Sequence, residues 1–155
     1  MQAFHLMSNH LLKLSQFIPY CLSVASNEIS QKIALTYQQR FGIDLMQWRV
    51  LAVLGEESQI SAQEVSERTA MDKVAVSRAV KKLLTANLLD REFAVEDKRR
   101  SILKLTNKGT QIYQQIVPLA KSYEERLLSQ LSDTEINEFM KLLTKLRQAN
   151  NNLEI

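Results

Sequence analysis

The stretch 61-SAQEVSERTAMDKVAVSRAVKKLLT-85 carries two helix starts in close succession. Ser61 and Glu64 form a capping box, in which a hydroxyl and a carboxylate satisfy the free amides of a helix start. Asp72 is a second N-cap residue soon afterwards. The first helix must therefore be short, and a second helix must begin at once.

The second predicted helix has an apolar face and a basic face. A rotation of about 100° per residue places four apolar residues on one stripe, namely Val76, Ala79, Val80 and Leu83. The opposite face carries Ser77, Arg78, Lys81 and Lys82, together with Val74 and Ala75. The apolar stripe predicts burial, and the basic face is left to meet a partner.

The basic face suits the major groove of double-stranded DNA. Arg78 can donate two parallel hydrogen bonds to guanine, Ser77 can meet a phosphate or a base edge, and Val74 can touch a thymine methyl group. Lys81 and Lys82 lie further along the helix, where point charges meet phosphate. The alternative is an ordinary solvated basic face, which this helix alone does not exclude.

A charged hairpin follows and favours the DNA interpretation. Residues 88–95 and 101–105 have the alternating, β-branched character of strands, and the tip between them contains Lys98, Arg99 and Arg100. Adjacent cations at a turn repel one another unless an anionic partner meets them. A narrow A·T minor groove is such a partner, because it concentrates negative potential. Asp97 can pair with Arg99 or Arg100 and so stiffen the tip.

Two short capped helices followed by a basic hairpin outline a winged helix-turn-helix. The sequence predicts a mainly α fold with a small β-hairpin, in which residues 44–109 form the DNA-binding core. Residues 73–108 contain ten Lys or Arg and four Asp or Glu, a net charge of +6, whereas the remainder contains ten and thirteen, a net charge of −3. The positive charge is thus gathered on the segment assigned to DNA.

Several motifs resemble those of the multiple antibiotic resistance regulator (MarR) family. The wing 97-DKRRSILKLTNKG-109, the helix 47-QWRVL-51 and the recognition helix 72-DKVAVSR-78 are similar to that family's motifs. Two positions depart from the pattern, since Ala75 stands where threonine is frequent and Ala70 lies in a turn that usually holds glycine. Alanine tolerates left-handed geometry less well, so this turn is expected to be shaped differently.

The N-terminal flank is predicted to be helical, because only three glycines and two prolines punctuate the whole chain. Pro19 is expected in the first turn of a helix that ends near Phe41, with residues 8–17 as a preceding helical arm. Asp44 is expected to cap the next helix, which ends near Gly55.

The C-terminal flank is predicted to form two helices. A long helix begins after Thr106, and Pro118 should kink it by removing one backbone hydrogen bond. Ser132 and Glu135 form a further capping box, which opens a last helix to about Ala149.

Apolar surface on the flanking helices predicts a dimer. The last helix carries Ile136, Phe139, Met140, Leu143 and Leu146 at helical spacing. So broad a stripe needs a partner surface, and a twofold dimer would bury it, as the family resemblance also implies. Residues 8–41 and 107–150 are therefore predicted to be dimerisation helices. The alternative is a compact, monomeric helical cap.

These features predict a homodimeric transcription regulator that binds a pseudo-palindromic operator. Each subunit would place the helix from Lys73 to Leu83 in the major groove and its wing, led by Arg99, in the minor groove. The resemblance implies a repressor released by a small aromatic effector, bound between the dimer helices and the winged core. Three aromatic residues could contact such an effector or belong to the core: Tyr37, Phe41 and Trp48.

The remaining chemistry is sparse. The chain has one cysteine, Cys21, two histidines, His5 and His10, and no glycine-rich phosphate loop. We therefore expect no enzyme activity and no cofactor. We also expect no metal, since a metal site would have to combine His5, His10 and Cys21 with Glu28. Some members of the resembling family sense oxidants through a cysteine in the first helix, so Cys21 is either a sensor or a small buried residue. A protein-interaction module that uses the winged surface is a further alternative.

Length and hydropathy bound the organisation of the chain. A length of 155 residues with 45% hydrophobic content fits a single domain with a sizeable core. No apolar run approaches membrane-spanning length, and the start lacks a charged segment followed by an apolar block. The expectation is one cytoplasmic domain, residues 1–155, without membrane contact.

Overall fold

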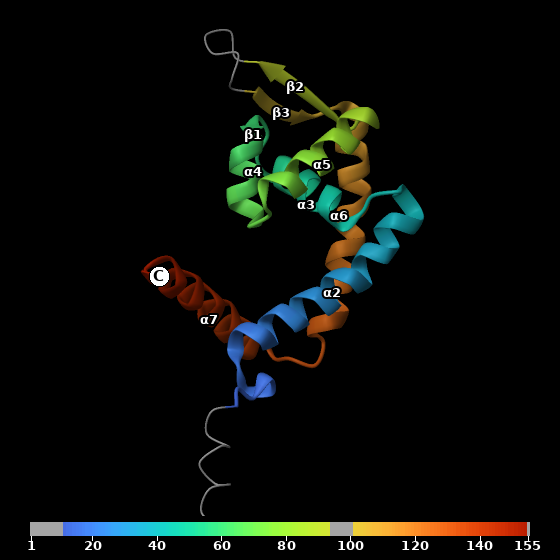
Figure 1. Ribbon diagram of the computed structural model, residues 1–155. Coiled ribbons are helices and arrows are strands. Elements are labelled where there is room, and N and C mark those ends of the chain that lie inside the picture. The colour runs from blue at the N-terminus through green and yellow to red at the C-terminus, as the bar shows by residue number, and fades with distance from the viewer. Residues whose placement is uncertain (1–10, 94–100, 155) are drawn as a thin grey trace, which may run out of the picture. The chain divides into compact units, whose positions relative to one another are not determined.

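The computed structural model describes residues 11–93 and 101–154 (Figure 1). In it, helices begin after the predicted capping residues. Helix α3 (Leu45–Glu56) begins after Asp44, whose carboxylate accepts a hydrogen bond from the Gln47 amide at 2.9 Å. Helix α4 (Ala62–Thr69) begins after Ser61, with the expected capping box. Helix α5 (Lys73–Thr85) begins after Asp72. The helix starts predicted for the winged core are confirmed.

The N-terminal flank contains helix α2 (Ile18–Phe41), with Pro19 in its first turn as predicted. The predicted helical arm over residues 8–17 is wrong for residues 11–17, which hold only the 3-10 turn η2 (Leu14–Gln16); residues 8–10 lie outside the described part. Phe17 has an extended backbone (φ −90°, ψ 104°) between the two elements. A continuous helix would drive the Pro19 ring into the carbonyl of the residue four positions earlier, so α2 must start afresh.

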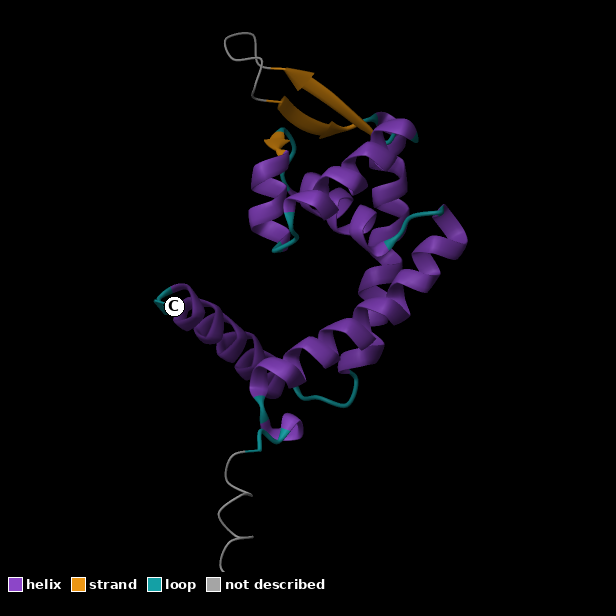
Figure 2. Ribbon diagram, in the orientation of Figure 1, coloured by secondary structure: helices purple, strands orange, loops and turns teal. Residues whose placement is uncertain are grey.

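Three strands form an antiparallel sheet in the order β1-β3-β2 (Figure 2). Strands β2 (Leu89–Phe93) and β3 (Ser101–Leu105) are the two strands of the predicted hairpin. Strand β1 (Ile60–Ser61) pairs with the other edge of β3 and was not predicted. Two residues are too few to show the alternating pattern of a strand. They form β1 because they pair with the edge of β3.

The core around α5 contains side chains from α3, α4, α5 and the sheet. Fully buried side chains from these elements are Val50, Leu51, Leu54, Val65, Val76, Val80, Leu83 and Leu103. The predicted apolar stripe of α5 is confirmed, since its four members are each no more than 3% exposed. Its burial leaves the opposite face of α5 to solvent.

The chain divides into two compact units, Met1–Gln114 and Gln115–Ile155, and the division falls inside helix α6 (Asn107–Leu128). Pro118 lies in this helix and has no amide proton for the carbonyl of Gln114, the last residue of the first unit. In the second unit, helix α7 (Asp133–Asn151) begins with the predicted capping box of Ser132 and Glu135 and has no buried residue. Helices after Thr106 and Ser132 are therefore confirmed.

Candidate nucleic-acid interface

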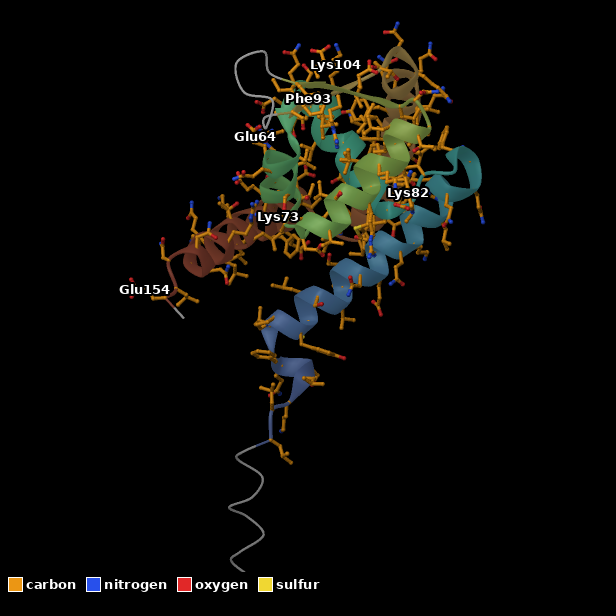
Figure 3. The ribbon with its side chains drawn as sticks, turned by 45° about the horizontal axis from the view of Figure 1, so that its top comes forward. Glu64, Lys73, Lys82, Phe93, Lys104 and Glu154 are labelled. Carbon is orange, nitrogen blue, oxygen red and sulfur yellow. The ribbon has the colours of Figure 1, made fainter. Side chains whose placement is uncertain are left out.

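Helix α5 presents a polar face to solvent along its whole length. The exposed residues of this face are Lys73, Val74, Ser77, Arg78, Lys81 and Lys82. Figure 3 labels Lys73 and Lys82, which lie toward the two ends of the helix. Ala75, predicted on the same face, is only partly exposed. The face contains four cations and a hydroxyl on a helix whose other side is fixed in the core.

The turn between α4 and α5 keeps a left-handed residue although it has no glycine. Ala70 has φ 52° and ψ 24°, the conformation that glycine usually supplies, so the expectation of a differently shaped turn is wrong. Hydroxyl groups hold the neighbouring backbone: Ser66 Oγ donates to the Met71 carbonyl at 2.6 Å, and Thr69 Oγ1 accepts from the Met71 amide at 3.3 Å. Met71 itself is buried, which anchors the turn against the core.

Lys82 is joined to helix α3 by an ion pair. Its Nζ lies 2.7 Å from Asp44 Oδ2, while Asp44 Oδ1 caps α3 through the Gln47 amide. Partial burial opposes ionisation of Asp44, but the hydrogen bonds from Lys82 and Gln47 and the lysine charge outweigh it, so the pKa of Asp44 lies below its ordinary value of 3.8. Arg78 and Lys81, by contrast, form no ion pair within the part of the chain that the structure describes.

The hairpin carries charge on both strands. Lys104 of β3 pairs with Glu92 of β2, and the hydrogen bond from this pairing raises the pKa of Lys104 above its ordinary value of 10.5. Phe93, labelled in Figure 3, lies at the end of β2. Its side chain is 61% exposed. The tip residues Asp97, Lys98, Arg99 and Arg100 lie outside the described residues, and their assigned roles stay predictions.

Thr106 joins the hairpin and α6 to the end of α5. Its Oγ1 donates to the Asn87 carbonyl at 2.8 Å and accepts from the Gly109 amide at 2.9 Å, so one hydroxyl caps α6 and ties it to the α5–β2 turn. Its backbone amide donates to the Leu88 carbonyl at 3.1 Å. The predicted helix start after Thr106 is thus also the point that fixes the base of the wing relative to α5.

Aromatic side chains of α2, α3 and α6 pack together. The Tyr37 and Trp48 ring centroids are 5.2 Å apart, and the Trp48 and Tyr113 rings are stacked at 6.0 Å. Tyr37 is completely buried, whereas Trp48 and Phe41 are partly buried. Tyr37 therefore has a core position in this chain.

Other candidate chemistry is not assembled in the described residues. Within them, no group of three or more His, Cys, Asp or Glu could hold a metal ion, and His5 and His10 lie outside them. The partly buried thiol of Cys21 lies 3.6 Å from the carbonyl oxygens of both Leu14 and Ser15. Residues 11–93 and 101–154 include no helix long and apolar enough to cross a membrane.

Comparison with known proteins identifies the family. The MarR family profile matches residues 41–100, which include α3, α4 and α5. The HTH-type transcriptional regulator BilQ of Clostridium symbiosum is 30% identical over 108 residues, 70% of this chain and 75% of BilQ. The relative is named as a transcriptional regulator, in agreement with the family profile.

Solved structures agree with the sequence comparison. The crystal structure of a MarR/EmrR family transcriptional regulator from Acinetobacter sp. ADP1 matches with a TM-score of 0.85 and 30% identity, over 92% of this chain and all of that one. MepR of S. aureus, crystallised in complex with DNA, shares the fold with a TM-score of 0.77 and 24% identity, over 86% of this chain and 98% of MepR. The chain belongs to the MarR family of transcriptional regulators.

Proposed function

We propose that this protein is a homodimeric repressor that binds a pseudo-palindromic, double-stranded DNA operator. The observation that carries the proposal is the division of α5 into two faces, one fully buried and one exposed and cationic. The backbone of a helix fixed in this way is already ordered, so placing it in a major groove does not have to order it. MepR, a protein with the same fold, was crystallised with DNA, which supports DNA as the partner.

The chemistry of the exposed residues of α5 assigns five of them a role, and Lys82 is treated separately below. Arg78 is the candidate for a bidentate contact with guanine, Ser77 for a base edge or phosphate, and Val74 for a thymine methyl group. Lys73 and Lys81 are candidates for phosphate contacts, which position the protein without reading sequence. In the wing, the cations Lys98, Arg99 and Arg100 would enter the minor groove beside this helix, stiffened by Asp97.

Exposed apolar side chains support the dimer. In the N-terminal flank they include Leu11, Leu12, Leu14, Phe17, Ile18, Tyr20 and Leu22, and in α7 they include Phe139, Met140, Leu142 and Leu146. Apolar surface gains about 25 cal/mol per Å² when it leaves water, so two such stretches favour association with a second copy. A dimer also places two recognition helices on one face of the duplex, with half-sites about 10 base pairs apart.

A small aromatic effector is the candidate signal for release of the operator. By the family resemblance it would bind between the dimer helices and the winged core. It would lower operator affinity only if it bound more tightly to a dimer whose recognition helices are wrongly spaced. The direction of regulation is then set by where the operator lies relative to a promoter.

Selection of bound duplexes from a random pool tests the proposal directly. The full chain should enrich an inverted repeat, and its affinity for that duplex should fall steeply as salt rises, because phosphate contacts release counterions. A reporter gene placed behind the recovered sequence then distinguishes repression from activation. Failure to enrich any sequence would refute operator binding and favour a winged surface that contacts a protein.

A further inference from the structure

The carboxylate of Asp44 makes two different bonds at once. Oδ1 accepts the hydrogen bond that starts α3, and Oδ2 lies 2.7 Å from Nζ of Lys82 on α5. The two residues are 38 positions apart in sequence, so the contact joins the N-terminus of one helix to the last turns of another. Asp44 is only one-third exposed, which holds its side chain more firmly than a freely solvated carboxylate.

The position of Lys82 makes this contact a restraint on rotation. The buried stripe of α5 holds the helix on the core, and the ion pair adds a directional contact outside that stripe. Lys82 is next in sequence to Leu83, the last residue of that stripe, and lies on the flank of the helix. An ion pair on the flank opposes rotation about the helix axis, which is the motion that would turn Arg78 away from a base edge.

Buried side chains of both helices pack α3 against α5, and the ion pair lies on the solvent-exposed side of this contact. A hollow of about 370 Å³ on one side is lined by Met46, Ala75 and Ala79 among others, and a hollow of about 500 Å³ is lined by Gln38, Gln47 and Thr85 among others. Asp44 and Lys82 line both hollows. The ion pair is therefore the polar link between the two helices at this open edge, in addition to their buried packing.

We infer that Lys82 is a positioning residue, which fixes the rotation of the recognition helix through Asp44, and that it does not contact phosphate. The neighbouring Lys81 is also exposed but forms no ion pair with a described residue, and so has its full charge available for DNA. This inference rests on the proposed operator binding. It divides two adjacent lysines, which the sequence does not distinguish, between two roles.

Salt dependence of operator binding separates the two roles. The probe is the duplex recovered by selection, with the full chain titrated between about 50 and 200 mM salt. Lys81→Met should reduce the slope of log affinity against log salt by about 0.9, the value for one lost phosphate contact. Lys82→Met should leave the slope unchanged and weaken binding about two- to fivefold, the range expected for one exposed ion pair.

For Asp44→Asn, the two possible roles of Lys82 predict changes in operator affinity of opposite sign. Asparagine caps a helix as well as aspartate does, so α3 keeps its start while the charge on Oδ2 is lost. If Lys82 positions the helix, Asp44→Asn should weaken binding by the same factor as Lys82→Met, and the double variant should be no weaker than either. If Lys82 meets phosphate, Asp44→Asn frees the ammonium group and strengthens binding.

Three results would overturn the inference while leaving operator binding intact. These are a reduced salt slope for Lys82→Met, a gain of affinity for Asp44→Asn, and unchanged affinity in both variants. A wild-type protein that binds no selected duplex would instead refute the proposed function, and the inference with it. Circular dichroism of each variant establishes that a loss of binding does not come from a loss of fold.

Discussion

Gly109 of α6 lies so close to the backbone of Leu88 that a Cβ atom on residue 109 would be 2.0 Å from the Leu88 carbonyl oxygen. The same oxygen accepts a hydrogen bond from the Thr106 amide at 3.1 Å, so it cannot retreat without breaking that bond. The contact seats the first turn of α6 on the turn between α5 and β2. Glycine is required here by space and not by backbone conformation.

Gly109→Ala should destabilise the protein. Forcing a methyl group against a fixed carbonyl is overpacking, which costs about 1 to 3 kcal/mol. Urea denaturation should show this loss in the free energy of unfolding. Gln111→Ala, at an exposed position of the same helix, is the matched control and should change it by less than about 0.5 kcal/mol. Equal effects of the two substitutions would show that the backbone can move to make room.

Ala70→Gly should stabilise the turn before the recognition helix. An L-residue in the left-handed region costs roughly 1 to 2 kcal/mol, whereas the extra freedom of glycine in the unfolded chain costs about 0.4 to 1 kcal/mol. The free energy of unfolding should therefore rise by up to about 1.6 kcal/mol. Ala86→Gly is the control, because Ala86 is also an exposed helix C-cap residue but has φ −80°. It should destabilise, and a stabilising Ala86→Gly would contradict the explanation.

The contribution of Asp44 to stability should depend on pH with a defined sign. Its pKa is lowered in the folded state, so the stabilising charge is fully present above the unfolded value and is lost as pH falls through the folded value. The difference in free energy of unfolding between wild type and Asp44→Asn should be constant near neutral pH and shrink below pH 3.8. In the Lys82→Met background, the part of this free-energy difference that depends on pH should be smaller. A free-energy difference that grows on acidification would contradict a lowered pKa for Asp44.

Arg78→Ala should change the base preference of the protein as well as its affinity. Loss of a bidentate contact with guanine costs about 1 to 3 kcal/mol and relaxes preference at one base position. Repeating the selection with the variant measures both effects. Lys81→Ala, one turn further along the same face, should weaken all sequences alike. A base preference unchanged by Arg78→Ala would mean that this residue does not read the groove.

Met140→Glu should weaken the proposed dimer. Met140 is 57% exposed on α7, and a buried methionine contributes about 1.5 to 3 kcal/mol that a carboxylate would forfeit, so the dimer dissociation constant should rise roughly tenfold or more. Lys141→Glu alters the next residue, also exposed and already polar, and should have little effect. Light scattering across a dilution series measures both. A wild-type monomer at micromolar concentration that binds operator fully would refute the dimer.

Local signals in the sequence determined where the helices of this protein begin. A capping residue at Asp44, Ser61, Asp72 or Ser132 acts through amides two or three positions away, so its effect can be read without knowing the rest of the fold. The buried stripe of α5 was predictable for the same reason, because helical periodicity depends only on spacing along the chain. The exposed position of Arg78 and Lys81 follows from that stripe.

Only the tertiary structure decided the contacts between distant segments. The two residues of β1 become a strand because β3 lies beside them, and Ala70 is left-handed because the buried Met71 and the surrounding hydroxyls fix its neighbours. Lys82 and Lys81 are equivalent in sequence, and they differ because Asp44, far away along the chain, comes within reach of one of them. Such pairings depend on how the core brings the helices together, and no pattern of neighbouring residues records that arrangement.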